Sequence, residues 1–245
     1  MTTGAAWYLV DAVPAAGEFV LDGPEGRHAA TVRRTRKGEQ LVLTDGRGNH
    51  CDATVTATGK TSLTLVVTNL RTEPLPALRV TVVQALPKGE RSDLAVDLLT
   101  EAGVDTVVPW QAERCVARWS GAKAQRGAEK WRMVAIQAGK QSRRAWVPTV
   151  RELASTPQVV DLIAAADAAL VLHESGSVAL QGMSLPASGE LLLIIGPEGG
   201  VSPREIEVFG AAGAQPVRLG PQVLRTSTAG AVALGAIGVR TDRWS

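Results

Sequence analysis

The chain has 245 residues, of which 45% are hydrophobic and 20% charged, and its formal net charge is +2. This length can bury a substantial core in one or two domains, and the composition is typical of globular rather than disordered or fibrous proteins. No basic stretch opens the chain as in a signal peptide, and no window offers the ~18 consecutive apolar residues of a membrane span. The two cysteines match no metal-binding or disulfide spacing. We therefore expect a cytoplasmic protein with no metal and no membrane partner.

Residues up to about Leu70 are predicted to be rich in β-strands. Runs of apolar and β-branched residues alternate there with the turn signals Asp45-Gly46, Gly48-Asn49 and Gly59-Lys60. A small barrel is the natural way to close several short strands of this kind. Residues 71–79 contain two prolines and are predicted to form a linker.

Beyond the linker, predicted strands alternate with predicted helices, which indicates a parallel α/β sheet. The expected strands are 79–86, 105–110, 169–174 and 191–195. A helix is expected over 92–102, and its predicted apolar stripe consists of Leu94, Leu98, Leu99 and Ala102. A further helix is expected to begin with Thr156 as its N-cap and Pro157 as its first residue.

A basic segment runs from Trp110 to Arg151, with ten Lys or Arg against two Glu, so that its charge is 10 − 2 = +8. Most of it is predicted to be a helix over 122–141, burying Trp131 and exposing Arg126 and Lys130. A smaller basic cluster lies at 32–39. Such clusters favour a polyanionic partner, because neutralised phosphates release counterions. The alternative is a solvated helix face.

The stretch "LLLIIGPEGGVSPREIEVF" (191–209) combines a buried strand, a glycine-rich turn and a capped helix. Ser202, Pro203 and Glu205 have the spacing of a capping box with proline at the first helical position. A glycine turn at the carboxyl end of a parallel strand is where open α/β sheets bind ligands. The stretch matches neither the P-loop nor the dinucleotide fingerprint, which disfavours a nucleotide triphosphate or NAD(P). Glycines needed only for the turn geometry are the alternative explanation.

A second glycine-proline loop, "LGPQVLRTSTA", follows another apolar strand near the C-terminus. With "IGPEGGVSPREIE", "LHE", "LPKGERSDLAVDLLTEAGVDTVVPW" and "EKWRMVAIQAGKQSRRAWVP", it resembles the SPOUT-class RNA methyltransferases, and within them the bacterial enzymes that methylate N3 of a uridine in 16S ribosomal RNA. "GRHAATVRRTRKGEQLVLTDGRG" resembles that family's PUA-like RNA-binding barrel. The resemblance implies an α/β fold: a PUA-like β-barrel over 1–73, then a SPOUT-like parallel sheet with a C-terminal trefoil knot over 74–245. Such knots are rare among folds.

The resemblance also implies S-adenosyl-L-methionine as the cofactor, bound among three loops by apolar side chains and exposed backbone groups. The implied cofactor-binding residues are Leu172, His173, Ile195, Gly196, Pro197, Glu198, Gly199, Gly200, Val201, Leu219, Gly220, Leu224, Arg225, Thr226 and Ala229. For His173 a packed loop histidine remains an alternative, and for Glu198 a brace of the loop.

Methyl transfer to a uracil nitrogen requires that the N3 proton leave, with a general base or with stabilisation of the anion. Arg225 is the first candidate catalytic residue, because a guanidinium can hold the uracil oxygens or a phosphate. Glu174 is the second, as a base or a positioning group. A structural salt bridge for Arg225 and a helix cap for Glu174 are the alternatives.

The implied partners are 16S ribosomal RNA, within the small ribosomal subunit, and a second copy of the chain, since such enzymes are generally homodimers. The helix after Thr226 is a candidate dimer interface. The predicted RNA-binding residues are Arg33, Arg34, Arg36, Lys140, Arg143 and Arg144.

The chain departs from the family pattern at Ser227, where many relatives carry Glu, and at 89–91, where the pattern is more Lys-rich. Other functions remain open from the sequence: methylation of another RNA such as tRNA, methylation of a ribose 2′-OH, or RNA binding without catalysis.

Overall fold

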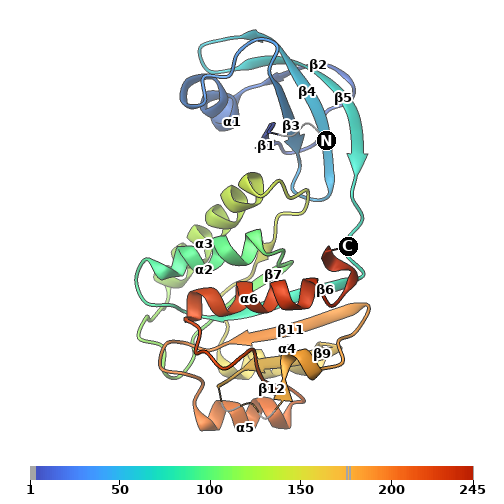
Figure 1. Ribbon diagram of the computed structural model, residues 1–245. Helices are drawn as coiled ribbons and strands as arrows, with labels where there is room; N and C mark the ends of the chain where they lie inside the picture. Colours follow the sequence, from blue (N-terminus) through green and yellow to red (C-terminus); the bar gives the residue numbers. More distant parts are fainter. Residues whose placement is uncertain (1–3, 175, 177, 245) are drawn as a thin grey trace. The chain divides into compact units, whose positions relative to one another are not determined.

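The computed structural model describes residues 4–174, 176 and 178–244. The chain forms two compact units, Met1–Leu75 with Gly139–Val147, and Pro76–Ala138 with Pro148–Ser245 (Figure 1). Within the described residues, no helix is long and apolar enough to cross a membrane.

The first unit is a five-stranded sheet in the order β1-β3-β4-β5-β2, in which only β1 and β3 pair in parallel. Its elements are β1 (Ala6–Leu9), β2 (Gly17–Leu21), α1 (Gly23–Arg27), a π-helical turn (His28–Val32), β3 (Gln40–Thr44), β4 (Asn49–Thr58) and β5 (Leu63–Thr72). The turns predicted at 45–49 and at 59–60 join β3 to β4 and β4 to β5. Its core is built from inward-facing strand residues such as Leu41, Leu43 and Leu65.

The segment Gly139–Val147 also belongs to the first unit, although the sequence offers no local signal for this. Backbone hydrogen bonds join Gly48 N to Ala145 O at 2.9 Å and Val147 N to Gly46 O at 3.0 Å. Gly48 leaves room for the Trp146 ring, since a Cβ there would lie 2.6 Å from it. A tight turn without a side chain therefore lets the returning segment pack against the sheet.

The second unit is a seven-stranded sheet in the order β10-β12-β9-β11-β6-β7-β8, and every neighbouring pair is parallel. The strands are β6 (Leu78–Ala85), β7 (Thr106–Trp110), β8 (Thr149–Val150), β9 (Ala168–Leu172), β10 (Val178–Ala179), β11 (Gly189–Ile195) and β12 (Gln215–Arg218). Residues 191–195 of β11 are at most 2% exposed, as expected for a central strand covered on both faces.

The helices of the second unit are α2 (Arg91–Glu101), α3 (Ala122–Gln141, of which 139–141 belong to the first unit), α4 (Thr156–Ala165), α5 (Pro203–Ala211) and α6 (Thr226–Gly238), and short 3₁₀ turns lie at Leu180–Gly182 and Asp242–Trp244. In α3, Trp131 is buried and Arg126 and Lys130 are exposed, as predicted. The capping box of α5 is confirmed, with Ser202 as N-cap and Glu205 at the third position.

Two local predictions are wrong. The N-cap of α4 is Ser155 rather than Thr156, because Ser155 is the extended residue and shares the capping box with Gln158. In α2, Leu94 is 44% exposed, and the buried face is instead formed by Ala95, Val96, Leu99 and Thr100. That face is the one covered by other elements of the unit, α6 among them, and a Cβ at Gly230 of α6 would lie 2.5 Å from the Leu99 side chain.

Helix α6 follows β12 in sequence but packs against α2, β6 and β11 (Figure 1). The chain therefore leaves β12, passes the ends of β9 and β11 and returns to the middle of the sheet. This is the connection expected of the C-terminal knot. Small residues permit it: Gly230 lies against α2, and Ala233 is fully buried.

Candidate active site

Three neighbouring strands of the second sheet end at the same level. Ile195 of β11 pairs with Leu172 of β9, and Leu172 pairs in turn with Val217 of β12. The loops that follow these strands, beginning near His173, Gly196 and Leu219, therefore start together. Because carboxyl ends of parallel strands form the ligand-binding edge of an open α/β sheet, these loops define the candidate site.

The glycine turn after β11 needs its glycines for two different reasons. At Gly200, φ is +73°, a backbone conformation that side chains disfavour, and its N–H bonds to Pro197 O at 2.9 Å to close the turn. At Gly196 a Cβ would lie 2.7 Å from the Val201 side chain. At Gly199 it would lie 3.2 Å from the Cβ of Arg114, which comes from another loop. The turn is therefore closely packed, both against its own residue Val201 and against the loop that carries Arg114.

A buried hydrogen-bond network anchors the next residues of the chain. Glu205, 3% exposed, accepts bonds from the N–H of Ser202 at 3.0 Å, the N–H of Glu113 at 2.8 Å and the hydroxyl of Thr156 at 3.2 Å. The Ser202 hydroxyl donates to the Glu113 carboxylate at 2.7 Å. One carboxylate thereby joins the start of α5, the loop after β7 and the start of α4.

The third loop, 219–225, ends at Arg225, the N-cap of α6, whose backbone is extended. The carbonyl of Arg225 accepts the N–H groups of Thr228 and Ala229, both at 2.9 Å. On the inner side, the buried amide of Gln84 donates to Thr226 O at 3.4 Å. The start of α6 is therefore fixed while the Arg225 side chain is exposed.

The three loops surround a cavity of about 930 Å³. All fifteen of the residues predicted to bind the cofactor line it: Leu172, His173, Ile195, Gly196, Pro197, Glu198, Gly199, Gly200, Val201, Leu219, Gly220, Leu224, Arg225, Thr226 and Ala229. Glu174 lines it as well, so both candidate catalytic side chains border the same space. Ser227 is buried and is not among the lining residues. Its difference from the family pattern therefore does not change the lining of the cavity.

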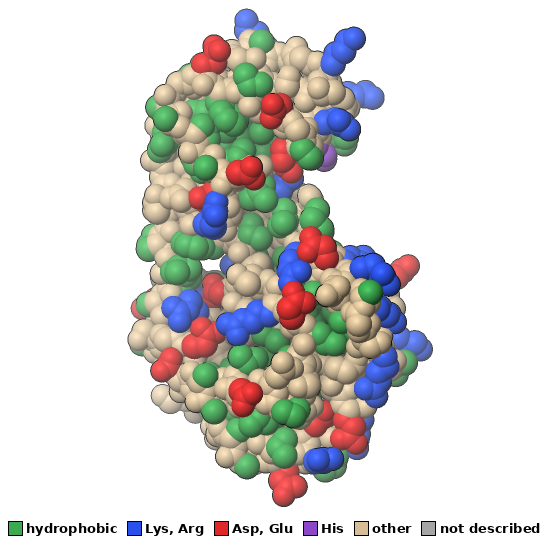
Figure 2. Space-filling model, turned by 180° about the vertical axis from the view of Figure 1, so that it is seen from behind, with side chains coloured by type: hydrophobic (Ala, Val, Ile, Leu, Met, Phe, Trp, Pro, Cys, Tyr) green, Lys and Arg blue, Asp and Glu red, His purple; other side chains and the backbone are tan. Residues whose placement is uncertain are grey.

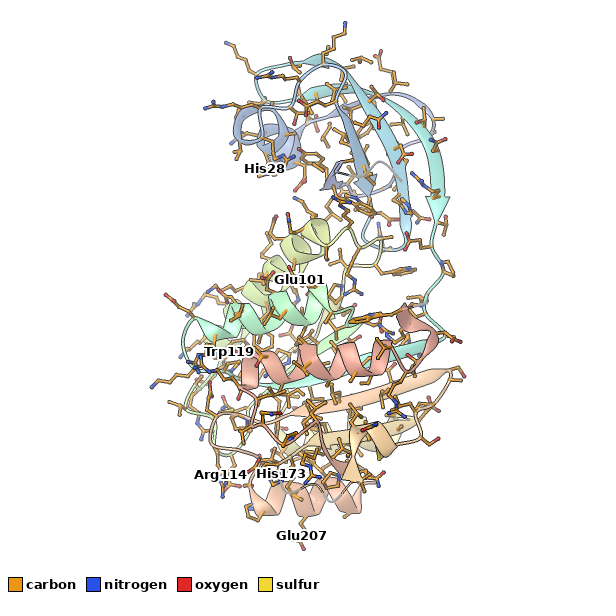
Figure 3. All side chains as sticks on the ribbon, viewed as in Figure 1. His28, Glu101, Arg114, Trp119, His173 and Glu207 are labelled. Atoms are coloured by element: carbon orange, nitrogen blue, oxygen red, sulfur yellow. The ribbon has the colours of Figure 1, made fainter. Side chains whose placement is uncertain are left out.

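Sequence reasoning missed several residues of the lining, among them Arg114, Ile206, Arg218 and Gln222. Arg114 comes from the loop after β7, outside the three predicted loops, and borders the same cavity as His173 (Figure 3). In the sequence, Arg114 could be recognised only as one cation of the basic segment, because it belongs to no motif. Beside it, burial raises the pKa of the Cys115 thiol, which keeps this residue a neutral anchor of the loop.

Glu198 has a defined partner: its carboxylate accepts a hydrogen bond from Lys88 N at 3.1 Å. It therefore braces the glycine turn against the loop after β6 and also lines the cavity. Among the residues described, no group of three or more His, Cys, Asp or Glu side chains could hold a metal ion.

All six predicted RNA-binding residues belong to the first unit, because Gly139–Val147 is part of it. Arg33, Arg34, Arg36 and Arg143 are exposed, and Arg144 is half-buried. Lys140 differs from the others. Its side chain is only 10% exposed, its ammonium is 2.7 and 2.9 Å from the two carboxylate oxygens of Glu25, and it lies 5.9 Å from the centre of the Tyr8 ring. Lys140 thus holds the returning segment to α1.

A parallel α/β sheet with a loop-lined cavity at its carboxyl edge, on a chain that also carries a small β unit, defines a two-unit ligand-binding α/β protein. Residues 73–238 match the family model described as an RNA methyltransferase domain, and residues 21–68 match that of an RNA methyltransferase PUA domain. The chain therefore belongs to the family of RNA methyltransferases that combine these two domains.

Among the similar proteins, two serve as examples, and both are named ribosomal RNA small subunit methyltransferase E. The one from Mycobacterium tuberculosis is 51% identical over 98% of this chain and 94% of its own length. The one from Bacillus subtilis is 31% identical over 91% of both chains.

Solved structures of the same fold contain the expected cofactor. The ribosomal RNA small subunit methyltransferase E of Neisseria gonorrhoeae, bound to S-adenosyl methionine, has a TM-score of 0.87 at 27% identity and covers 97% of this chain and 98% of that one. A Legionella pneumophila protein solved with the cofactor SAM has a TM-score of 0.85 at 28% identity, over 98% and 99% of the two chains. These similarities confirm the SPOUT-like fold and the PUA-like first unit.

Proposed function

We propose that this protein transfers a methyl group from S-adenosyl-L-methionine to N3 of a uridine in 16S ribosomal RNA, acting as a homodimer in the cytoplasm. The observation that carries the proposal is the convergence of three loops, 172–174, 195–201 and 219–226, on one cavity at the sheet edge. The names of the relatives point to the same RNA, because they act on the small ribosomal subunit.

The residues of the cavity fit S-adenosyl-L-methionine. Leu172, Ile195, Leu219 and Leu224 supply apolar walls of the kind that enclose an aromatic base. At Gly220 a Cβ would find, among the described residues, only the Gln222 side chain within 4 Å, so the backbone there is open to a ligand. Cavities of about 300–1,000 Å³ suit ligands of this size, and about 930 Å³ falls within that range.

The cofactor supplies a methyl group on a positively charged sulfur. The residues of the chain have to position the uracil and manage its N3 proton. Arg225 is exposed at the cavity, and no carboxylate pairs with it among the described residues. Its guanidinium is therefore available to stabilise the negative charge that develops on the uracil oxygens. Glu174, also exposed there, is the candidate group for accepting the proton or for holding the base.

RNA binding is assigned to the first unit through Arg33, Arg34, Arg36, Arg143 and Arg144. The family match to a PUA domain over 21–68 supports this assignment. Lys140 is left out, because its charge is already neutralised by Glu25. A uridine within folded RNA must also be turned outward before its N3 reaches the cavity, which needs such backbone contacts to hold the flanking strand.

The dimer is assigned to the face of α6 and the turn that follows. Val232, Val239 and Trp244 are 48%, 73% and 54% exposed there, which is unusual for large apolar side chains on adjoining elements. Replacing Val239 by Asp should convert a dimer into a monomer in analytical ultracentrifugation. A wild-type protein that sediments as a monomer at micromolar concentration would contradict the assignment.

The first experiment is calorimetric titration of the wild-type protein with S-adenosyl-L-methionine, with NADH as the control ligand. The matched variant is Gly220→Phe, chosen because the backbone at this position has room and no positive φ, so that the fold is retained while the cavity is filled. We expect binding of S-adenosyl-L-methionine alone, weakened at least tenfold in the variant. No binding by the wild type would remove the cofactor from the proposal.

The second experiment identifies the product. Undermodified 16S RNA, free or assembled into small subunits, is incubated with the protein and cofactor, and the nucleosides are separated by chromatography with mass detection. We expect N3-methyluridine. A ribose-methylated or C5-methylated nucleoside, or a product found only with tRNA, would assign the protein to another reaction of the class.

The third experiment tests the RNA contacts through salt dependence. The variant Arg33→Glu with Arg36→Glu should weaken RNA binding. The slope of log K against log salt should fall by about 1.4–1.8, from roughly 0.7–0.9 for each of the two lost phosphate contacts. The control is Lys60→Glu, an exposed cation of the same unit in the β4–β5 turn. Each replacement changes the net charge by −2, so an effect of Lys60→Glu half as large as that of the double variant would show only a change of net charge.

A further inference from the structure

One cation reaches the cavity from outside the three cofactor loops. Arg114 lies in the loop after β7, lines the cavity, and donates from Nη1 to Gly199 O at 3.2 Å. Gly199 also lies close to the rest of Arg114: a Cβ at Gly199 would lie 3.2 Å from Arg114 Cβ and 3.3 Å from the Arg114 carbonyl oxygen. The glycine turn is therefore shaped to accommodate this arginine.

The loop that carries Arg114 is held on both sides by buried groups. On one side, Glu113 bonds through its N–H to Glu205 and through its carboxylate to Ser202. On the other, Cys115 is 4% exposed and its N–H bonds to Ala112 O at 3.2 Å. Arg118 adds a bond to Glu113 O at 2.8 Å. Because both neighbours are fixed, the backbone of Arg114 is held in place before a ligand arrives. This lowers the entropy cost of binding a ligand there.

Arg114 keeps its positive charge available within the part of the chain that the structure describes. Among the described residues no carboxylate lies within ion-pair distance of it, and one bond to Gly199 O leaves most of the five guanidinium N–H donors unused. The cavity lining contains three arginines, Arg114, Arg218 and Arg225, against two carboxylates, and one of these, Glu198, is already bonded to Lys88 N. Lys and Arg side chains also gather along one edge of this unit (Figure 2).

We propose that Arg114 binds an anionic oxygen group of a ligand at the mouth of the cavity, while its bond to Gly199 fixes the glycine turn around that ligand. The inference rests on the proposed function, because it assigns a further residue to the same site. The guanidinium fork matches carboxylate and phosphate equally well. Under the proposed function, two ligands carry such a group: the cofactor has a carboxylate and the RNA has phosphates.

The test compares Arg114→Ala, Arg114→Gln and Arg114→Lys with the wild type. Glutamine keeps an N–H donor for Gly199 O without the charge, and lysine keeps the charge without the fork. The matched control is Arg204→Ala, which removes an exposed arginine of α5 that does not line the cavity. Circular dichroism and thermal melting check that each variant is folded.

Two binding measurements separate the sources. Calorimetry gives the affinity for S-adenosyl-L-methionine and for 5′-methylthioadenosine, which has the nucleoside and sulfur but no carboxylate. Fluorescence anisotropy gives the affinity for an RNA oligonucleotide without cofactor, at several salt concentrations.

If Arg114 holds the cofactor carboxylate, Arg114→Ala weakens S-adenosyl-L-methionine at least tenfold and leaves 5′-methylthioadenosine within twofold. If it holds an RNA phosphate, RNA affinity falls, the salt slope drops by about 0.7–0.9, and cofactor affinity is unchanged. In either case Arg114→Lys retains more affinity than Arg114→Gln, and Arg204→Ala behaves as the wild type.

The inference is overturned if folded Arg114→Ala changes neither affinity, or if Arg114→Gln restores wild-type binding, since the residue then only braces the loop. Failure of the proposed function gives a different pattern: the wild type itself does not bind S-adenosyl-L-methionine. The RNA measurement, made without cofactor, still decides on Arg114 in that case.

Discussion

Replacing Glu205 by Ala removes the acceptor that joins three elements of the second unit. The N–H groups of Ser202 and Glu113 and the hydroxyl of Thr156 all lose a partner within 3.2 Å. Because Glu205 is 3% exposed, water does not simply replace the carboxylate.

The magnitude follows from the individual losses. The capping box of α5 contributes about 1 kcal/mol, and a buried donor left without an acceptor costs about 1–3 kcal/mol. The bond from the N–H of Glu113 is only partly buried, so its loss adds less than that of a fully buried donor. We expect a loss of about 2–4 kcal/mol in the free energy of unfolding, which lowers Tm by about 4–16 °C in a chain of this size.

The assay is thermal unfolding followed by circular dichroism and calorimetry, with Glu207→Ala as the control. Glu207 lies on the same helix, two residues further on, and its exposed side chain points away from the unit (Figure 3). We expect Tm of the control to stay within about 1 °C of the wild type, as is usual for exposed positions. Equal Tm values for the two variants would refute the claim that the network stabilises the site.

Three further predictions concern single positions. Arg225→Ala should lower kcat about 10²–10³-fold, the usual effect of losing one stabilising donor, with cofactor affinity by calorimetry within a few-fold; near-normal turnover would remove it from the mechanism. Lys140→Met leaves Glu25, 22% exposed, without its cation. The free energy of unfolding of the first unit, measured by urea titration, should fall by about 2–4 kcal/mol. An unchanged unfolding midpoint would mean that the ion pair contributes nothing. Gly26→Ala should cost about 1–3 kcal/mol, because its Cβ would collide with the Leu21 carbonyl oxygen; a stable variant would show that α1 shifts freely.

Local chemistry made much of the fold predictable. Glycine-containing turns, the capping box of Ser202 and Glu205, and the apolar run at 191–195 each depend on residues only a few positions apart. The error at α4 has the same local origin, because Ser155 and Thr156 are both competent caps and the pattern does not choose between them. The candidate cofactor loops were recognised through family resemblance, since nothing in their periodicity reveals that they meet.

Contacts between distant segments were beyond such reasoning. Leu94 has helical spacing for burial but lies on the open side of α2, and only the placement of the elements packed on that helix explains why. Arg114 belongs to a basic segment that looks uniformly solvated, yet the packing of Gly199 brings it to the cavity. In the sequence Lys140 looks like its neighbour Arg143, but its ammonium is bound by Glu25, 115 positions earlier in the chain.

The sequence by itself determined the local elements, the turns that need glycine and, through resemblance, the class of reaction. Tertiary structure decided which charges meet a partner and which stay available, as Lys140 and Arg114 illustrate. The physical reason is the distance along the chain over which each kind of interaction acts. Turn and cap preferences arise within about five residues, whereas burial and ion pairing depend on which segments the folded chain brings together.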